Sequence, residues 1–384
     1  MTERRFYEFA ALTVALALLG VMSYLLLGAH GLVLANGQPL FGDFIAFWSA
    51  GRAALDGHAA QVHDVATIGA YHQLAAPGSH YVAPWNSPPP FLLIASALAV
   101  LPYPVAALLF LAISSAIYIF AARRILPDAR AMIFALTLPA ALYHLGTVQT
   151  GLLIAGVCGL AMSWLDRRPL AAGAVVGLLA IKPHLALLWP LLLAFSGRWR
   201  AFAAATVSTL AFILLAGFVF SFDAYGRFIE NLRASQEMIS AQRITTPAYA
   251  SLYASALGFG APQVIALALQ VVSAFAAIGA AVWVFLRGKR TAQGAALCAA
   301  TLLVSPYLFF YDFTLLALGV ALLGAPRDRF ELAAAILAWS AGLSLALGYL
   351  APLPLCPLAA WLVLIAAMRR ARSAAARPAL APQP

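Results

Sequence analysis

The sequence predicts an all-α, polytopic membrane protein, a helical bundle with about 12 transmembrane helices. Of its 384 residues, 64% are hydrophobic and only 9% are charged, which is unlike a soluble globular domain. The apolar runs are long and are separated by short polar breaks, a pattern typical of helices that cross a bilayer. The whole chain, 1–384, is expected to form one membrane-embedded domain.

The positive charge is arranged in short clusters between the apolar runs. A net charge of +10 could suggest a nucleic-acid-binding protein, but this spacing follows the positive-inside pattern of multi-pass membrane proteins. We therefore expect the clusters, and both chain ends, on the cytoplasmic side, and no nucleic-acid partner. The clusters are Arg4-Arg5, Arg123-Arg124, Arg167-Arg168, Arg198/Arg200, Arg287/Lys289/Arg290, Arg327/Arg329 and Arg369-Arg370.

The first helix, 6–28, is too long for the apolar part of a signal peptide and is expected to remain as an outward span. It leads to a first external loop, 29–87, which is predicted to be partly helical. Segment 104–122 is the next span, whereas 88–101, at 14 residues, is short and lies between proline-rich breaks. We interpret 88–101 as re-entrant or interfacial; if it crossed as well, Arg123-Arg124 would lie outside.

From Arg123 onward, two apolar segments lie between successive basic clusters, so that each pair returns the chain to the side it left. A second external loop is expected at 220–261, and a disordered cytoplasmic tail at 370–384. The pairs are 131–145 with 150–165, 170–181 with 183–196, 201–219 with 262–286, 291–307 with 308–324, and 330–349 with 353–368.

The first candidate for a functional residue is Asp43, in the stretch QPLFGDFIAFWSAGRAALDGH that follows the first helix. Asp is a preferred helix N-cap, and a cap alone is one interpretation of this position. The other is that the surrounding phenylalanines and Trp48 desolvate the carboxylate, which raises its pKa and makes it a better base. Asp56 is interpreted as part of a helix stop, and Asp64 as the cap of a helix over 65–75.

The second candidate is Lys182, one of only two lysines in the chain. The apolar segment before it is about 12 residues, or roughly 18 Å of helix, too short to cross the bilayer. Lys182 is therefore expected below the outer surface, where an unpaired ammonium is costly and functional by default. Its natural counter-charge would be a phosphate whose lipid tail stays in the bilayer; a snorkelling lysine is the structural alternative.

Two pairs of residues at the outer face could contact a sugar or an acceptor. Trp85 and Asn86, in the rigid run PWNSPPP, offer a ring for stacking and an amide for hydrogen bonds, but an aromatic membrane anchor fits as well. His144 and Gln149, in HLGTVQTG, could bond a sugar or phosphate, and a plain glycine turn is the alternative.

A third pair, Tyr311 and Asp312, ends another apolar segment and could line the same cavity at the outer face as the first two pairs. No metal site is expected, because the histidines of the first loop lack the tight spacing of metal ligands. The three cysteines lack paired spacing and are interpreted as small core residues: Cys158, Cys298 and Cys356.

In combination these motifs resemble glycosyltransferase family 87, multi-pass enzymes of the GT-C type similar to polyprenol-phosphate-mannose-dependent α-mannosyltransferases. The chain departs from the family pattern where an SPxSWxHH-like stretch is frequent, because both histidines are missing there. The matching segments, within residues 38–320, are GDFIAFWSAGRAALDGH, SPPPFLLIASALAVLP, GTVQTGLL, RRPLAAGAVVGLLAIKPHLALL and SPYLFFYDF.

The resemblance implies a hexosyltransferase of the inner or plasma membrane. It would move a hexose, mannose by analogy, from a polyprenyl-phosphate donor to a glycolipid or glycan acceptor on the external face, with inversion and no cofactor. Asp43 would be the general base, and Lys182 with His184 would bind the donor phosphate. Two alternatives stay open: a transporter or flippase of a lipid-linked anion that binds it through Lys182, and a non-catalytic protein of envelope assembly.

Overall fold

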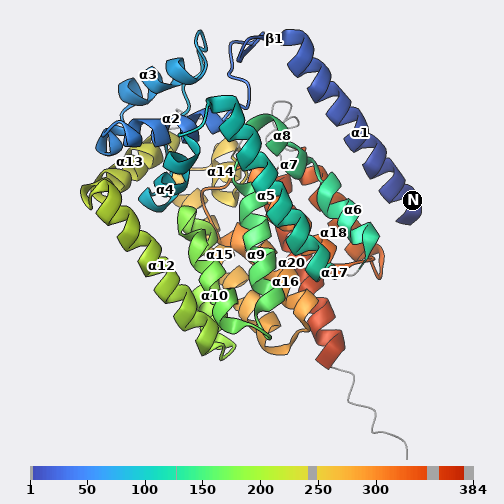
Figure 1. Ribbon diagram of the computed structural model, residues 1–384. Coiled ribbons are helices and arrows are strands. Elements are labelled where there is room, and N and C mark those ends of the chain that lie inside the picture. Colours follow the sequence, from blue (N-terminus) through green and yellow to red (C-terminus); the bar gives the residue numbers. More distant parts are fainter. Residues whose placement is uncertain (1–2, 127, 241–248, 344–353, 376–384) are drawn as a thin grey trace, which may run out of the picture.

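The computed structural model describes residues 3–126, 128–240, 249–343 and 354–375. These residues form a bundle of helices with a single two-stranded hairpin, which confirms the predicted all-α class (Figure 1). Helix α1 (Glu3–Gly28) stands to one side of the bundle, where it contacts α6 (Ala129–Thr137) and α7 (Pro139–Leu142).

The segment predicted as the first external loop is partly helical, as expected. The strands β1 (Ala29–His30) and β2 (Val33–Leu34) pair antiparallel, and α2 (Phe44–Leu55), η1 (Ala59–Gln61) and α3 (Val65–Ala75) follow. The Asp64 carboxylate accepts a hydrogen bond from the Thr67 backbone N–H at 2.8 Å, which confirms the predicted cap. Asp56 ends α2 and forms an ion pair with Arg52 at 2.6 Å, so its predicted structural role is also confirmed.

Helix α4 (Pro89–Leu98) has only 10 residues, whereas α5 (Tyr103–Ile125) has 23 and is long enough to cross a bilayer. Both helices begin with proline in the first turn, where its missing N–H costs nothing. The segment predicted as one helix, 131–145, is instead divided into α6, α7 and α8 (His144–Thr147). The first break lies at Leu138, because a residue before proline avoids the helical conformation.

The two segments that flank Lys182 are half-length. The chain runs through α9 (Gly151–Trp164) into α10 (Pro169–Gly177) and then bends through two 3₁₀ turns, η2 (Leu178–Ile181) and η3 (Pro183–Leu185), into α11 (Leu188–Phe195). Lys182 sits at the bend with a non-helical backbone, because Pro183 follows it. The predicted short approach to Lys182 is therefore confirmed.

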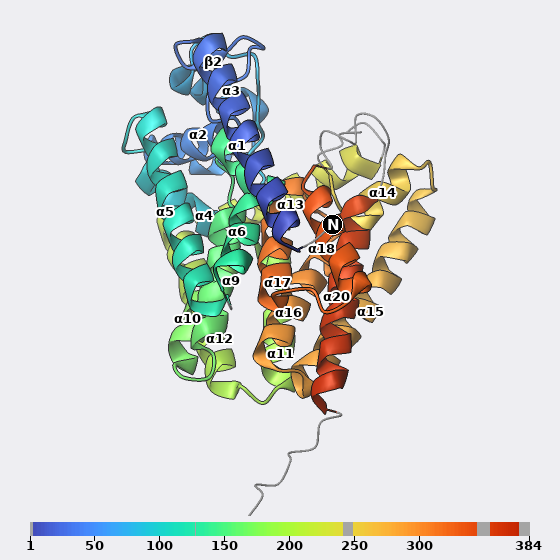
Figure 2. The ribbon, with the colours of Figure 1, turned by 90° about the vertical axis from the view of Figure 1, so that its right-hand side faces the viewer.

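The remaining helices complete the bundle, and Figure 2 shows α4, α5, α9 and α10 beside the group that contains α15, α16, α17 and α20. The last helix continues to Ala375, so the disordered tail predicted from residue 370 does not begin there; 376–384 and 344–353 lie outside the described residues. These elements are α12 (Trp199–Phe220), α13 (Asp223–Ser240), α14 (Leu252–Gly258), α15 (Gln263–Arg287), α16 (Arg290–Val304), η4 (Phe310–Phe313), α17 (Thr314–Leu323), α18 (Arg329–Ala341) and α20 (Leu355–Ala375).

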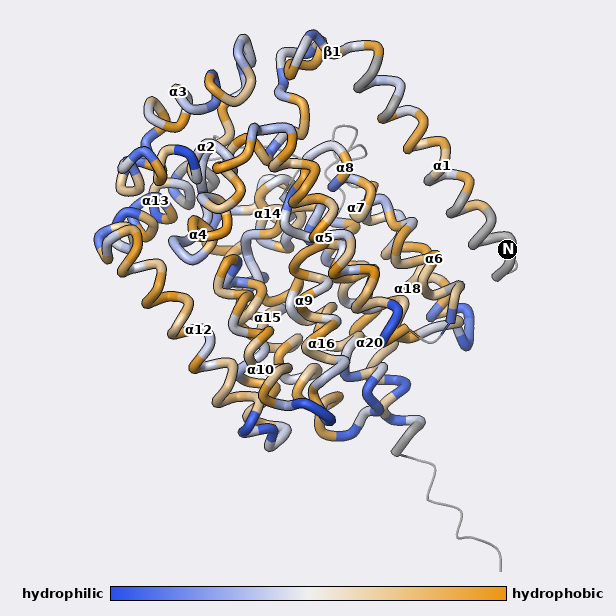
Figure 3. The backbone as a smooth tube through the Cα atoms, in the orientation of Figure 1, coloured by the Kyte–Doolittle hydropathy of each residue, from blue (hydrophilic) through white to orange (hydrophobic). Residues whose placement is uncertain are grey.

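Among the described residues, three helices are long and apolar enough to cross a membrane: α5, α12 and α15. The chain is a membrane protein by this measure, but the predicted count of about 12 spans stays a prediction. Several apolar segments are broken by proline or by 3₁₀ turns into helices of 10–17 residues. Figure 3 shows that hydrophilic residues gather at the two ends of the bundle, around α2, α3 and α13 and at the turns of the opposite end.

Helix α2 crosses α4 at a distance that only glycine allows. A Cβ atom added to Gly51 would lie 2.2 Å from the carbonyl oxygen of Ala95. The same side of α2 buries Phe44 and Phe47, which pack on Phe110 of α5 with ring centroids 5.7 and 6.0 Å away. This packing fixes the start of α2, and with it the position of Asp43.

We expect Gly51→Ala to destabilise the protein by about 1–3 kcal/mol, because α2 and α4 would have to separate. Gly69→Ala in α3 is the matched control, since no atom lies within 4 Å of its Cβ position and alanine favours helices. Thermal unfolding of both variants in detergent provides the measurement. A Gly51→Ala protein that melts no lower than the Gly69→Ala protein would contradict the tight α2–α4 contact.

Candidate functional site

The Asp43 carboxylate is held by two side chains from distant parts of the chain. The hydroxyl group of Tyr81 donates a hydrogen bond to Oδ1 at 2.9 Å, and Nε2 of Gln149 donates one to Oδ2 at 3.0 Å. The backbone of Asp43 is helical, and its side chain makes no capping bond to α2. Asp43 occupies the N-cap position of α2, but its side chain bonds no backbone N–H of the first turn, so the interpretation of Asp43 as a cap alone is wrong.

Burial raises the pKa of the Asp43 carboxyl group, in agreement with the predicted desolvation. The hydrogen bonds from Gln149 and Tyr81 and the positive charge of Lys182 act in the opposite direction, because they stabilise the ionised form. The result is a carboxylate with a raised pKa that is nevertheless fixed in orientation by two donors. Such a group combines the proton affinity and the geometry that a general base requires.

Unusual backbone conformations surround this contact. Phe41 has φ = 66° and Val148 has φ = 50°, in the left-handed region that side chains other than glycine seldom adopt. For a β-branched residue such as Val148 this conformation costs about 1–3 kcal/mol. Gly42 lets the segment before α2 lie close to the turn before α9, because a Cβ atom there would lie 3.2 Å from the carbonyl oxygen of Gly146. The strained residues thus flank Asp43 and Gln149 and bring them together.

Lys182 forms an ion pair with Asp312, with Nζ 2.5 Å from Oδ1. The Asp312 side chain is fully buried, and that of Lys182 is 14% exposed. The second oxygen of Asp312 accepts a bond from the Phe309 backbone N–H at 3.1 Å, and the ammonium group lies 4.8 Å from the centre of the Tyr311 ring. Lys182 therefore has a counter-charge within the protein, a carboxylate that the fold brings from 130 residues away.

His144 packs next to the segment that carries Tyr311 and Asp312. It is completely buried, and its Nε2 lies 3.1 Å from Oγ1 of Thr314. Gly151, at the start of α9, leaves no room for a side chain: a Cβ atom would lie 2.5 Å from the carbonyl oxygen of Tyr311 and 2.6 Å from Nε2 of His144. This contact packs the turn that carries Gln149 onto the segment that carries Tyr311 and Asp312.

Trp85 and Asn86 are placed differently from the cluster. The Trp85 ring is 2% exposed and stacks on Phe91, with ring centroids 5.4 Å apart, while Phe47 meets it edge-on at 6.1 Å. Its faces are covered by protein, so stacking on a sugar would require a rearrangement. Oδ1 of Asn86 accepts a hydrogen bond from Nδ2 of Asn231 at 2.9 Å, which connects this segment to α13.

His184 lies two residues after Lys182. Its Nε2 atom is buried and has no hydrogen-bond partner within the described part of the chain. Buried polar atoms are nearly always paired, so an orphan nitrogen beside Lys182 is a position where a ligand oxygen could bind. In the described ranges, no group of three or more His, Cys, Asp or Glu side chains is arranged to hold a metal ion.

Tyr81 is a residue of this candidate site that sequence reasoning missed. It lies in a loop, 38 positions from Asp43, with no pattern of spacing that would connect the two. The run PWNSPPP follows Tyr81 in the sequence, but its residue types pointed to Trp85 as the candidate and not to Tyr81. Only the folded loop shows that the tyrosine hydroxyl group reaches the carboxylate.

The family comparison establishes the class of this protein. The model of glycosyltransferase family 87 matches residues 85–306, more than half of the chain. The chain belongs to glycosyltransferase family 87. It is therefore a membrane glycosyltransferase. The match includes Gln149 and Lys182, whereas Asp43 and Tyr81 precede it and Asp312 follows it. Comparisons with curated proteins and with solved structures gave no match.

The hydrogen bond from Tyr81 gives a prediction about protonation. It lowers the pKa of Asp43, so Tyr81→Phe should raise that pKa further, because the ionised carboxylate loses one of its two side-chain donors. The carboxyl group would then take up its proton at a higher pH than in the wild-type protein. Infrared difference spectra across a pH series measure this step, with Asp43→Asn used to assign the carboxyl band.

Tyr71→Phe is the control for that titration. The Tyr71 hydroxyl group interacts with Asp56 and not with Asp43, so its removal should leave the Asp43 titration unchanged. Identical midpoints for Tyr81→Phe and the wild-type protein would show that Tyr81 does not stabilise the ionised carboxylate.

Proposed function

We propose that this family 87 enzyme transfers a hexose, with mannose as the first candidate, from a polyprenyl-phosphate donor to a glycolipid or glycan acceptor. The observation that carries the proposal is the proximity of a preoriented carboxylate and a recessed cation. Lys182 lies close enough to Asp43 to lower the pKa of its carboxyl group. A base for the acceptor and a positive charge for the phosphate are the two groups that this transfer needs.

Asp43 acts on the acceptor in this mechanism. An acceptor hydroxyl group attacks the anomeric carbon of the sugar and gives its proton to the Asp43 carboxylate. The bond between that carbon and the phosphate oxygen breaks, and its electron pair leaves with the polyprenyl phosphate. A single displacement of this kind inverts the anomeric configuration. The leaving phosphate is stable as an anion, so a general acid is not required.

Lys182 acts on the donor. An ammonium group has three N–H donors, and the ion pair with Asp312 uses one of them, which leaves donors for a phosphate. Asp312, held by the Phe309 backbone, keeps the lysine oriented before the donor binds. The orphan Nε2 of His184 is a further group that could contact a phosphate oxygen. Gln149 and Tyr81 are positioning residues for Asp43.

The lipid nature of the donor and the side of the reaction belong to the same proposal. Lys182 lies at the bend between two half-length apolar segments, below the outer end of the bundle, where the tail of a lipid-linked phosphate could remain among apolar helices. Arginines of three basic clusters line one pocket, in agreement with a common cytoplasmic end. The Asp43 cluster would then face the external side of the cell membrane.

The test of the base is Asp43→Asn. Asparagine keeps the size of the side chain, and the amide of Gln149 can turn its oxygen toward the new N–H group, so folding should be retained. Loss of the base should lower the transfer rate by roughly 10²–10⁴-fold. The assay uses purified protein, a labelled polyprenyl-phosphate sugar and a membrane-lipid acceptor extract. A folded variant with near wild-type turnover would reject Asp43 as the base.

Asp56→Asn is the matched control for Asp43→Asn. It makes the same substitution at the other end of α2, where the carboxylate interacts with Arg52 in an exposed ion pair and with the Tyr71 hydroxyl group. Surface ion pairs contribute little, so we expect transfer at the wild-type rate. A similar loss in both variants would attribute the effect to charge in this region and not to Asp43.

The test of the phosphate site must take the ion pair between Lys182 and Asp312 into account. Replacing Lys182 alone would leave the buried Asp312 carboxylate without a counter-charge, which typically destabilises a protein by about 3–5 kcal/mol. The double variant Lys182→Met with Asp312→Asn removes both charges together and should remain folded. We expect its donor affinity to fall by about 10–100-fold, the usual effect of losing one charge-assisted hydrogen bond. Equilibrium binding of the labelled donor measures this loss.

Lys182→Arg is the companion variant. It keeps the positive charge but changes the geometry, so it should retain donor binding in part. Donor affinity at the wild-type level in the double variant would exclude Lys182 from the phosphate site, whatever the transfer rate.

A further inference from the structure

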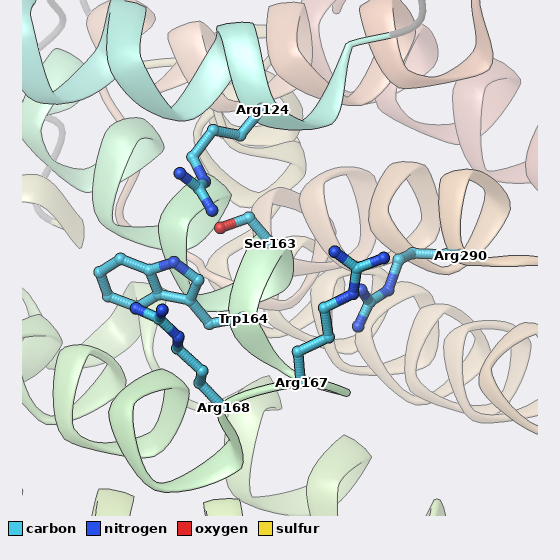
Figure 4. Close-up of a pocket in the computed structure, with 6 residues that line it drawn as sticks. All are labelled: Arg124, Ser163, Trp164, Arg167, Arg168 and Arg290. Atoms are coloured by element: carbon cyan, nitrogen blue, oxygen red, sulfur yellow. The ribbon is translucent and has the colours of Figure 1, made fainter.

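A hollow of about 380 Å³ lies at the other end of α9 from the Asp43 cluster. Gly151 at the start of α9 contacts the cluster, and Trp164 at its end lines the hollow, so the two sites are about 20 Å apart at 1.5 Å per residue. Figure 4 shows the side chains that surround it. The lining residues are Arg124, Ser163, Trp164, Arg167, Arg168 and Arg290.

The four arginines come from three separate segments: the end of α5, the turn after α9 and the start of α16. Asp166, which precedes Arg167 in the chain, pairs with Arg290 at 2.8 Å and with Arg198 at 3.3 Å. In the described part of the chain, no ion pair is formed by the other three lining arginines. One carboxylate, shared with an arginine outside the hollow, does not neutralise this set.

Among the lining arginines, Arg290 is engaged by Asp166 through Nη2, whereas Arg124 retains free donors. The guanidinium group of Arg124 lies over the Phe120 ring, 5.3 Å from its centre, which leaves its N–H groups available. Planar guanidinium groups bind phosphate oxygens in pairs, and several in one cleft concentrate the local field for an anion. The chemistry of the hollow is that of a phosphate site.

Two neighbouring side chains indicate the source of the phosphate. Phe120 on α5 is 50% exposed, and Leu170, which follows Arg168-Pro169 on α10, is 62% exposed. A phosphate that carries acyl chains could place them against these exposed apolar side chains, whereas a soluble phosphate would leave them uncovered. Basic pockets between membrane helices recognise anionic lipid head groups in this way. We propose that the hollow binds the phosphate of an anionic membrane phospholipid.

Native mass spectrometry of the full-length, delipidated protein tests the proposal. Phosphatidylglycerol and phosphatidylcholine with identical acyl chains are added separately in detergent. We expect the anionic lipid to bind at least about tenfold more tightly, and Arg167→Gln with Arg168→Gln to abolish the difference. Arg123→Gln with Arg200→Gln is the matched control: it removes the same charge from neighbouring basic clusters, but neither residue lines the hollow. The control should retain the preference.

Two results would overturn the proposal. An equal loss of binding in the control would assign the attraction to the basic face as a whole. Glycerol 3-phosphate that binds as tightly as the lipid would identify a soluble phosphate as the ligand. Thermal unfolding verifies that both double variants are folded, and Arg124→Gln, from a different segment, repeats the test if the Arg167/Arg168 variant is unfolded. Because binding is measured without transfer, the result does not depend on the roles of Asp43 and Lys182.

Discussion

The buried ion pair between Lys182 and Asp312 is the interaction on which the arrangement of the site depends. An ammonium group among apolar helices is stable only with a counter-charge, and a buried carboxylate has the same requirement. The pair therefore holds the bend before α11 against the turn before α17. The Phe309 backbone N–H and the Tyr311 ring complete the environment of the two charges. Such pairs add little net stability, but they fix which segments meet.

Close backbone contacts make this arrangement possible. Gly51 lets α2 lie against α4, Gly151 lets α9 begin against Tyr311, and Gly173 lets α10 approach α12, where a Cβ atom would lie 2.1 Å from the Ala201 carbonyl oxygen. In a membrane the hydrophobic effect does not drive helices together, so close packing at small residues contributes much of the association. The left-handed backbones at Phe41 and Val148 are compatible with this packing because the surrounding helices hold them.

The two ends of the bundle have opposite chemistry. One end carries a carboxylate that two neutral donors and the charge of a nearby lysine stabilise in its ionised form. The hollow at the other end gathers four arginines near one shared carboxylate. A lipid-linked sugar and an anionic membrane lipid would therefore engage separate sites connected by α9. A lipid bound in the hollow would contact the end of α9, the helix whose start follows Gln149.

The sequence by itself determined the properties that depend on composition and on near neighbours. The apolar runs predicted an all-α membrane protein, the scarcity of charge singled out Asp43 and Lys182, and Asp64 was correctly placed as a helix cap. Tertiary structure decided everything that depends on distant partners. Asp43 bonds Tyr81 and Gln149, 38 and 106 positions away, and Lys182 pairs with Asp312, 130 positions away. Whether Trp85 presents its ring or buries it also depends on distant packing. Hydrophobic patterns report burial along one segment, but a hydrogen bond requires two segments to meet within about 3 Å, which only the folded chain specifies.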